Sequence, residues 1–338
     1  MSLRAKAPLR VSFAGGGTDV RPFPTTDGGC VLSATINRFA YGSLRPRRDR
    51  QITIESVDYG TSLDFGVKDP MMFDGKLDMV KAVIRELGAS EEEGYDLLLH
   101  SSAAPGSGLG SSSTVMVCLI GLLKERYKLD LNDYEIAQMA YHVEREQLGI
   151  HGGSQDQYAA VFGGFNFIEF GDDSVVVNPL RIRDDIVNEL EHNMLLAYTG
   201  MTRASSEIIE DQTQRLESGV DDTVGGLREQ KRLAVEMKAA LLRSQLSLFG
   251  ELLGHAWEQK KRMSTKITNA YIDEICAAAR SHGALGGKVT GAGGGGYVLH
   301  YCDFHKKHKV ADALSSMGAA VEEFAFVKRG LVTWRADD

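Results

Sequence analysis

The sequence predicts an α+β protein that is divided into two domains. Its 338 residues are too many for one simple core and suit two domains of ordinary size. Strand-like and helix-like segments follow one another in uneven runs, without the regular alternation of a doubly wound sheet. Glycine is in excess, with 37 residues or about 11% against roughly 7% on average, and 18 of them fall in four short stretches. We therefore expect several loops of unusual backbone between the strands and helices.

Composition and charge exclude several classes of protein. With 43% hydrophobic and 25% charged residues, the chain is expected to fold rather than remain disordered. Its longest apolar run, Val115 to Leu123, is far shorter than the roughly 20 residues that cross a bilayer. The N-terminus has no apolar signal-peptide core, and the net charge of −8 argues against a nucleic-acid partner. We expect a cytoplasmic protein without a membrane or nucleic-acid partner, and the sequence leaves its oligomeric state open.

The first 60 residues are typical of an antiparallel group of strands. β-Branched and aromatic residues alternate there with turn residues. The expected strands are residues 8–14, 31–37, 39–44 and 51–57. Because the basic segment Arg45 to Arg50 lies between the last two, we interpret it as the solvated tip of a hairpin, with anion or partner binding as the alternative.

The segment from residue 76 to residue 180 mixes helices with strands. Apolar residues recur at helical spacing in 76–87, 111–127 and 132–148. We expect strands at 95–101, 165–170 and 174–180. A polar stretch after Pro179 places the domain boundary near residue 180.

The second half of the chain is expected to be mostly helical before it ends in strands. The helical segments are 203–260 and 268–282, with a short helix from His305. The expected strands are 194–200, 296–301, 321–326 and 331–335.

One of the glycine clusters resembles known nucleotide-binding loops but fails their tests. A P-loop needs Ser or Thr after Gly-Lys, whereas Val289 follows Gly287-Lys288. The run Gly291 to Gly296 matches GxGxxG, yet a strand follows it, whereas a dinucleotide fingerprint must open a helix. Neither pattern therefore predicts the nucleotide site.

The better phosphate loop is Pro105 to Thr114, with the sequence PGSGLGSSST. Three alternating glycines permit positive φ angles, and three serines then begin an amphipathic helix. Backbone N–H groups and hydroxyls can thus converge on one anion. A plain serine-capped loop is the alternative, although one serine would suffice for a cap.

These residues resemble the GHMP kinases, the family of galactokinase, mevalonate kinase and homoserine kinase. Four segments match in the family's order: Ala7 to Val20, Ala104 to Ser112, Gly152 to Gly164 and Lys288 to Leu299. In the second, proline lies one residue closer to the glycines than in the family pattern. The resemblance extends from residue 7 to about 330. It implies a ribosomal-protein-S5-like N-terminal domain over residues 1–180 and a ferredoxin-like C-terminal domain over residues 181–338.

The resemblance implies an ATP- and Mg²⁺-dependent sugar kinase with an aspartate at its centre. Asp156 matches the carboxylate that accepts or steers the hydroxyl proton, and Arg10 matches its basic partner. A helix-capping aspartate and a merely structural ion pair are the alternatives. For Mg²⁺ the resemblance implies Ser112 and Glu144; Glu146 lies two residues on, and in an α-helix both cannot face one metal. The segment that cradles ATP consists of Pro105, Gly106, Ser107, Gly108, Leu109, Gly110, Ser111, Ser112 and Ser113.

The same resemblance implies an acceptor site for a sugar. Asp19 matches a sugar-contacting aspartate, whereas Gly16-Gly17 replaces the Glu-His of galactokinases and argues against galactose. The other implied substrate residues are Thr18, Gly16, Gly17, Gly291, Gly293, Gly294 and Arg203. Arg21, Arg203 and Lys288 are candidates to hold a second phosphate on the sugar, with a solvated surface charge as the alternative for each.

Within the family, the chain resembles most the kinases of heptose 7-phosphate, with fucokinase domains as near relatives. The segment Tyr198 to Ile208 adds to this likeness. The implied reaction converts a heptose 7-phosphate to the 1,7-bisphosphate, in the synthesis of nucleotide-activated heptose. A fucose or galactose 1-kinase is the alternative enzyme, and a non-catalytic sugar and nucleotide sensor is the alternative from another class.

Overall fold

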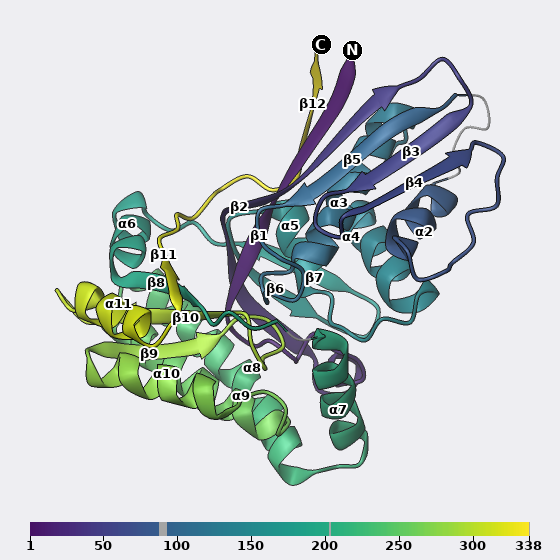
Figure 1. Cartoon of the computed structure of the whole chain (residues 1–338). Helices are drawn as coiled ribbons and strands as arrows, with labels where there is room; N and C mark the ends of the chain where they lie inside the picture. The colour runs from purple at the N-terminus through teal and green to yellow at the C-terminus, as the bar shows by residue number, and fades with distance from the viewer. Residues whose placement is uncertain (88–92, 203, 338) are drawn as a thin grey trace.

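The computed structural model describes residues 1–87, 93–202 and 204–337, which form two sheets with helices packed against them (Figure 1). The larger sheet has eight strands, and its main path runs β12-β1-β2-β5-β3-β4. β6 and β7 extend it from β2. Its strands are β1 (Ser2–Ala14), β2 (Gly29–Pro46), β3 (Gln51–Ser56), β4 (Thr61–Gly66), β5 (Tyr95–Ser101), β6 (Phe165–Phe170), β7 (Val175–Pro179) and β12 (Val332–Ala336).

The long strand β2 corrects two predictions. Residues 31–37 and 39–44 belong to this one strand, because its first half pairs with β6 and its second half with β5. The predicted hairpin between 39–44 and 51–57 is wrong, since β5 lies between β2 and β3 and runs parallel to β3. Asp96 of β5 forms ion pairs with Arg45 and Arg47, so these basic residues are tied to the inserted strand.

In the first half, the helices α2, α4 and α5 pack against α3. This helix is buried over most of its circumference and contacts β1 and β2. A π-helical turn, η1, continues directly from α4. The elements are α1 (Phe23–Asp27), α2 (Asp78–Glu86), α3 (Ser111–Tyr127), α4 (Asp133–Tyr141), η1 (His142–Gln147) and α5 (Gln155–Phe162).

The second half of the chain forms a four-stranded sheet in the order β11-β8-β10-β9. The strands are β8 (Met194–Tyr198), β9 (Ala284–Val289), β10 (Tyr297–Cys302) and β11 (Ala320–Glu322). The helices are α6 (Asp184–Asn193), α7 (Ser205–Glu217), α8 (Asp221–Leu242), α9 (Leu246–Met263), α10 (Ala270–Ser281) and α11 (Lys307–Ser316). The predicted strand 321–326 is shorter, because between β11 and Phe326 the chain leaves the sheet, and Phe326 forms an isolated bridge to Ile36.

One apolar core joins the two sheets. Leu9 and Phe13 of β1 pack with Phe249 of α9 and Leu299 of β10. The chain also returns to the larger sheet at its end, where β12 pairs with β1 and both termini lie together (Figure 1). This packing holds the glycine loops of the two halves against each other. Within the described ranges, no helix is long and apolar enough to cross a bilayer.

Candidate active site

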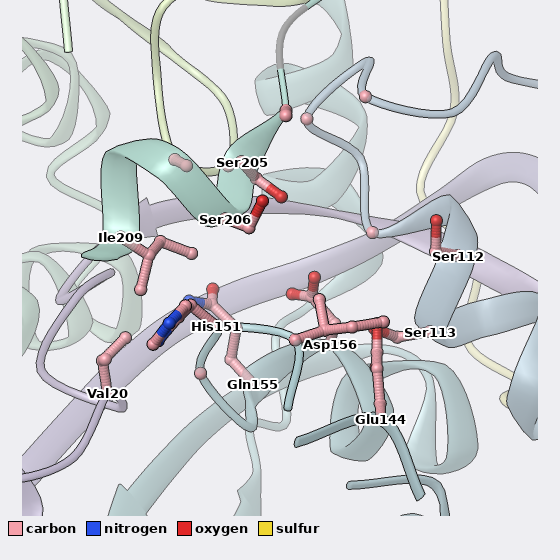
Figure 2. Close-up of a pocket in the computed structure, with 18 of the residues that line it drawn as sticks. Val20, Ser112, Ser113, Glu144, His151, Gln155, Asp156, Ser205, Ser206 and Ile209 are labelled. Atoms are coloured by element: carbon pink, nitrogen blue, oxygen red, sulfur yellow. The ribbon is translucent and has the colours of Figure 1, made fainter. Parts of the chain in front are cut away.

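A cavity of about 380 Å³ lies where the two halves of the chain meet. Its walls come from β1, the glycine loop before α3, η1 and the start of α5 on one side. The start of α7, the end of α9 and the loop after β9 form the other side. Figure 2 shows polar side chains from both sides turned toward this space.

Arg10 and Asp156 form a tight ion pair at the centre of the cavity. Arg10 donates to Asp156 Oδ1 from Nε at 2.8 Å and from Nη2 at 2.6 Å, and from Nη1 to the carbonyl of Gly108 at 2.6 Å. Among the described residues, none bonds to Asp156 Oδ2. Ser154 occupies the N-cap of α5, so Asp156 is not its capping residue. The pair thus leaves one carboxylate oxygen directed into the cavity (Figure 2).

The loop before α3 has the backbone of an anion site. Gly106, Gly108 and Gly110 have φ angles of 76°, 84° and 78°, values that side chains disfavour. Gly110 occupies the N-cap position, so no side chain satisfies the first N–H groups of α3 there. A Cβ at Gly110 would lie 3.1 Å from Asp156 Cγ. The loop therefore presents free N–H groups next to the aspartate, which is more than a serine-capped turn provides.

Most of the predicted cradle lines the cavity, and two residues instead anchor it. Ser107 and Leu109 are buried. The carbonyl of Ser107 accepts from the N–H of Tyr297 at 3.0 Å, and that of Leu109 accepts from the N–H of Arg10 at 3.1 Å. The lining residues are Pro105, Gly106, Gly108, Gly110, Ser111, Ser112 and Ser113.

The two glutamates considered as magnesium ligands, Glu144 and Glu146, lie on the π-helical turn in different surroundings. Glu144 is only 4% exposed at the cavity wall, where its Oε2 accepts from Ser113 Oγ and Gln157 Nε2, both at 2.7 Å. Glu146 is 56% exposed and pairs with His142. Glu144 Oε1 has a single long contact, 3.3 Å to Arg145. Of the two glutamates, Glu144 lines this cavity and Glu146 does not.

Asp19 is buried at the opposite end of the cavity. Its Oδ1 accepts from the N–H of Gly17 at 3.0 Å, and both of its oxygens accept from Gln155 Nε2 at 3.0 Å. A Cβ at Gly153 would lie 1.9 Å from Asp19 Oδ2, so only glycine fits there. The carboxylate is thus fixed in direction at the cavity wall.

The other predicted substrate residues divide into three groups. Gly17, Gly291 and Gly293 line the cavity, whereas Gly16 and Gly294 do not. Thr18 lies behind the wall, where its hydroxyl donates to the carbonyl of Gly15 at 2.8 Å. Arg203 lies outside the described residues.

Neither remaining candidate for a second phosphate reaches this cavity. Lys288 is buried and donates from Nζ to the carbonyl of Ser12 at 2.8 Å. Arg21 lines a neighbouring cavity and donates to the carbonyl of Asp172 at 3.1 Å.

Several lining residues escaped the sequence analysis. Lys260 is buried in the wall, and its Nζ donates to the carbonyl of Gly291 at 2.6 Å. Its position three residues after Trp257 continues the apolar face of α9, a signal that could have revealed a buried lysine. His151, Ser205 and Ser206 also turn toward the cavity (Figure 2); the two serines lie in the segment Tyr198 to Ile208, where no role was assigned to them.

A second recess of about 420 Å³ adjoins the glycine loop. It shares six lining residues with the first cavity: Tyr59, Met79, Pro105, Ser111, Ser112 and Ile150. Its walls are more apolar and include Tyr59, Leu77, Met79, Val115, Leu148 and Ile150. A flat apolar group can therefore lie beside an anion at the start of α3.

Comparison with known proteins adds family evidence to this geometry. The family model described as GHMP kinases N terminal domain matches residues 76–164, and the one described as GHMP kinases C terminal matches residues 237–320. The chain is 38% identical to a D-glycero-alpha-D-manno-heptose 7-phosphate kinase of Campylobacter jejuni, with 99% of each chain covered.

Two further relatives are a fused enzyme and a solved structure. The L-fucokinase/L-fucose-1-P guanylyltransferase of Bacteroides fragilis is 28% identical, over 87% of this chain and 34% of that one. The crystal structure of a D-glycero-D-manno-heptose 1-phosphate kinase from Bacteroides thetaiotaomicron is 33% identical, with a TM-score of 0.83 over 99% of this chain and 100% of that chain.

Proposed function

Because the chain belongs to the GHMP kinases, phosphotransferases that act on a hydroxyl group, we propose that it phosphorylates the anomeric hydroxyl of a heptose 7-phosphate. ATP is the phosphoryl donor of this family. The proposed product is the 1,7-bisphosphate. The observation that carries the proposal is the free Oδ2 of Asp156, which faces a cavity beside an open helix N-terminus.

In this proposal ATP lies across the cavity and the adjoining second recess. Its phosphates occupy the loop from Gly106 to Ser113, where backbone N–H groups and the dipole of α3 favour negative charge. Its base enters the apolar recess beside Tyr59 and Met79. The shared lining residues make this continuous path possible.

The residues present fit a magnesium ion that is completed by phosphate oxygens. Glu144 and Ser112 both line the cavity (Figure 2), and Glu144 Oε1 has one long contact, 3.3 Å to Arg145. Within the described ranges, no three His, Cys, Asp or Glu side chains cluster as cation ligands. Phosphate oxygens of the nucleotide and water would complete the shell. When bound, the ion would offset charge on the transferred phosphoryl group.

Asp156 and Arg10 have different roles at the acceptor hydroxyl. Asp156 Oδ2 accepts the proton of the anomeric hydroxyl as that oxygen attacks the γ-phosphorus. Arg10 binds Oδ1 with two nitrogens, which fixes the direction of the carboxylate. Because Gly110 lies against Asp156, the attacked phosphorus and the base are held in one small volume.

A heptose phosphate is favoured over other sugars by the relatives. The name of the Campylobacter jejuni relative specifies the 7-phosphate, and that protein matches over the full length of this chain. The sugar end of the cavity offers Asp19 for hydroxyl groups, with His151, Ser205 and Ser206 nearby for a polar substituent.

An ADP-release assay on a panel of sugars tests this function. The panel contains D-glycero-D-manno-heptose 7-phosphate, fucose, galactose and mannose, and ³¹P NMR assigns the phosphorylated carbon. We expect heptose 7-phosphate to give the highest kcat/KM and the new phosphate to lie on the anomeric carbon. Preference for fucose or galactose contradicts the proposed substrate, and the absence of turnover with every sugar contradicts the kinase itself.

A further inference from the structure

Lys260 is a buried cation that the proposed mechanism leaves without a role. It lies near the end of α9 with 4% of its surface exposed, and it lines the cavity. Its one hydrogen bond joins Nζ to the carbonyl of Gly291 at 2.6 Å. Among the described residues it forms no ion pair. Two of its three N–H donors therefore remain without a protein acceptor.

Charged groups from three other elements surround this ammonium. Arg10 of β1 adds positive charge, Asp156 of α5 adds negative charge, and Asp19 lies in the loop after β1. The charge of Arg10 is already taken up by Asp156. Lys288 of β9 is a further buried lysine without an ion-pair partner among the described residues. Among the charged side chains that line the cavity, Arg10 pairs with Asp156 and Arg145 contacts Glu144. Asp19 is the carboxylate left near Lys260, and Gln155 already binds both of its oxygens.

Burial lowers the pKa of Lys260 to about 8, against the opposing attraction of Asp19. An ammonium in such a place costs free energy unless an anion accompanies it. A buried charge that costs stability at a cavity wall is typical of a functional site. Because Asp19 is held by Gln155 and forms no ion pair with Lys260, an anionic group of the substrates is expected to bind the ammonium.

We propose that Lys260 is a catalytic residue that donates hydrogen bonds to the phosphoryl group during its transfer. This inference rests on the proposed kinase function. In the step, the bond between the γ-phosphorus and the leaving oxygen of ATP breaks, and a bond from phosphorus to the sugar oxygen forms. The hydroxyl proton passes to Asp156, while Lys260 keeps all its protons and neutralises charge on the phosphoryl oxygens.

The position of the Lys260 ammonium, close to both ends of the cavity, suits direct contact with the phosphoryl group. A Cβ at Gly16 would lie 3.7 Å from both Lys260 Nζ and Gln155 Nε2, so the ammonium lies close to the groups that hold Asp19. Its bond to Gly291 also joins it to the loop that packs on Gly108. The ammonium therefore lies between the sugar end and the phosphate end of the cavity.

Lys260→Met tests the proposal, and Lys261→Met is the matched control. Lys261 is the next residue on α9, but it is 27% exposed and pairs with Glu258 at 2.9 Å. We expect Lys260→Met to lower kcat about 100-fold or more while the KM for the sugar changes less than about threefold. We expect Lys261→Met to retain wild-type kcat. The sugar used is whichever one the wild-type enzyme phosphorylates best.

The melting temperature separates catalysis from a structural role. Methionine replaces an unpaired buried charge with an apolar side chain, so Lys260→Met is expected to melt at or above the wild-type temperature at pH 7. A lower melting temperature with a proportionate loss of activity overturns the proposal. So does a defect confined to the KM of a phosphorylated sugar, because the ammonium would then serve the distal phosphate.

Nucleotide binding gives a second test that needs no sugar. Calorimetry compares the affinities for AMP-PNP and ADP, which differ by the γ-phosphate. We expect the preference for the triphosphate to fall about tenfold in Lys260→Met and to persist in Lys261→Met. An unchanged preference overturns the role of Lys260. If the wild-type protein binds nucleotide but phosphorylates no sugar, the proposed function is contradicted. The AMP-PNP and ADP affinities of the two variants still test whether Lys260 contacts the γ-phosphate.

Discussion

At the scale of single residues, each acidic side chain of the cavity is held by a neighbour that fixes its direction. Arg10 holds Asp156, Gln155 holds Asp19, and Ser113 together with Gln157 holds Glu144. Such contacts orient each carboxylate toward a ligand or a proton.

Replacing Glu144 tests the proposed metal site. Glu144→Gln removes the charge that the ion needs, so we expect the Mg²⁺ concentration for half-maximal turnover to rise about tenfold or more. Steady-state rates measured over a Mg²⁺ titration check this. The control is Glu146→Gln, which alters an exposed side chain on the same turn and is expected to behave as wild type. An unchanged Mg²⁺ dependence in Glu144→Gln contradicts the assignment.

Residue by residue, the sequence predicted the groups that carry a motif and missed those that do not. Arg10 and Asp156 are 146 positions apart, yet the order of the family segments predicted their pairing, which the structure contains. Lys260 has no motif, and a run of basic residues at a helix end is normally solvated. Its burial depends on the packing of α9 against β9 and β1, which local sequence does not encode.

At the scale of elements, two glycine loops form the site because their backbones touch. A Cβ at Gly108 would lie 2.6 Å from the carbonyl oxygen of Thr290, and one at Gly291 would lie 2.7 Å from Gly108 Cα. Glycine is required on both sides of this contact. The contact seats the loop after β9 on the phosphate loop before α3.

Gly291→Ala tests this close approach against a matched control. Gly219 has a φ of 67°, almost the 66° of Gly291, but a Cβ there would meet nothing within 4 Å. Gly219→Ala should therefore cost only about 1 kcal/mol of backbone strain. We expect Gly291→Ala to cost at least about 1 kcal/mol more and to lower kcat/KM at least about tenfold, as measured by chemical denaturation and steady-state kinetics. Equal effects of the two variants contradict the close-approach account.

Elements with a strong local pattern were predicted well, and those defined by distant partners were not. The periodic helix 111–127 is confirmed as α3. The short helix α5 escaped prediction because glycines flank it on both sides. The pairing of β5 between β2 and β3 joins segments about 50 residues apart, which no local pattern reveals.

At the scale of the whole molecule, the site depends on the way the second half of the chain packs on the first. α8 and α9 lie against β1 and β2, and α9 carries Lys260 into the shared cavity. The predicted α+β fold of a two-domain GHMP kinase is confirmed, whereas the boundary near residue 180 stays a prediction.

The burial of Lys260 makes the stability of the molecule depend on pH. Its pKa is about 8 in the folded protein, below the ordinary value of 10.5, so the folded state binds fewer protons between these values. This group therefore destabilises the fold below pH 8, and the penalty disappears as pH rises toward 10.5. Arg10, Asp19, Asp156 and Lys288 surround the group in wild type and variant alike.

Chemical denaturation of wild type and Lys260→Met at pH 7 and pH 10 measures this linkage. We expect the stability advantage of the variant to shrink by an amount on the order of 3 kcal/mol between the two pH values. A difference that stays constant with pH shows that Lys260 is not buried as an ammonium.

The central claim is that Asp156 handles the acceptor hydroxyl of an ATP-dependent sugar kinase. Its most direct test is single-turnover phosphoryl transfer by Asp156→Asn, with the exposed Asp173→Asn as control and with ATP affinity measured in parallel. We predict that Asp156→Asn binds ATP nearly as well as wild type and transfers the phosphoryl group about 100- to 1000-fold more slowly or worse. Transfer at the wild-type rate would contradict the account.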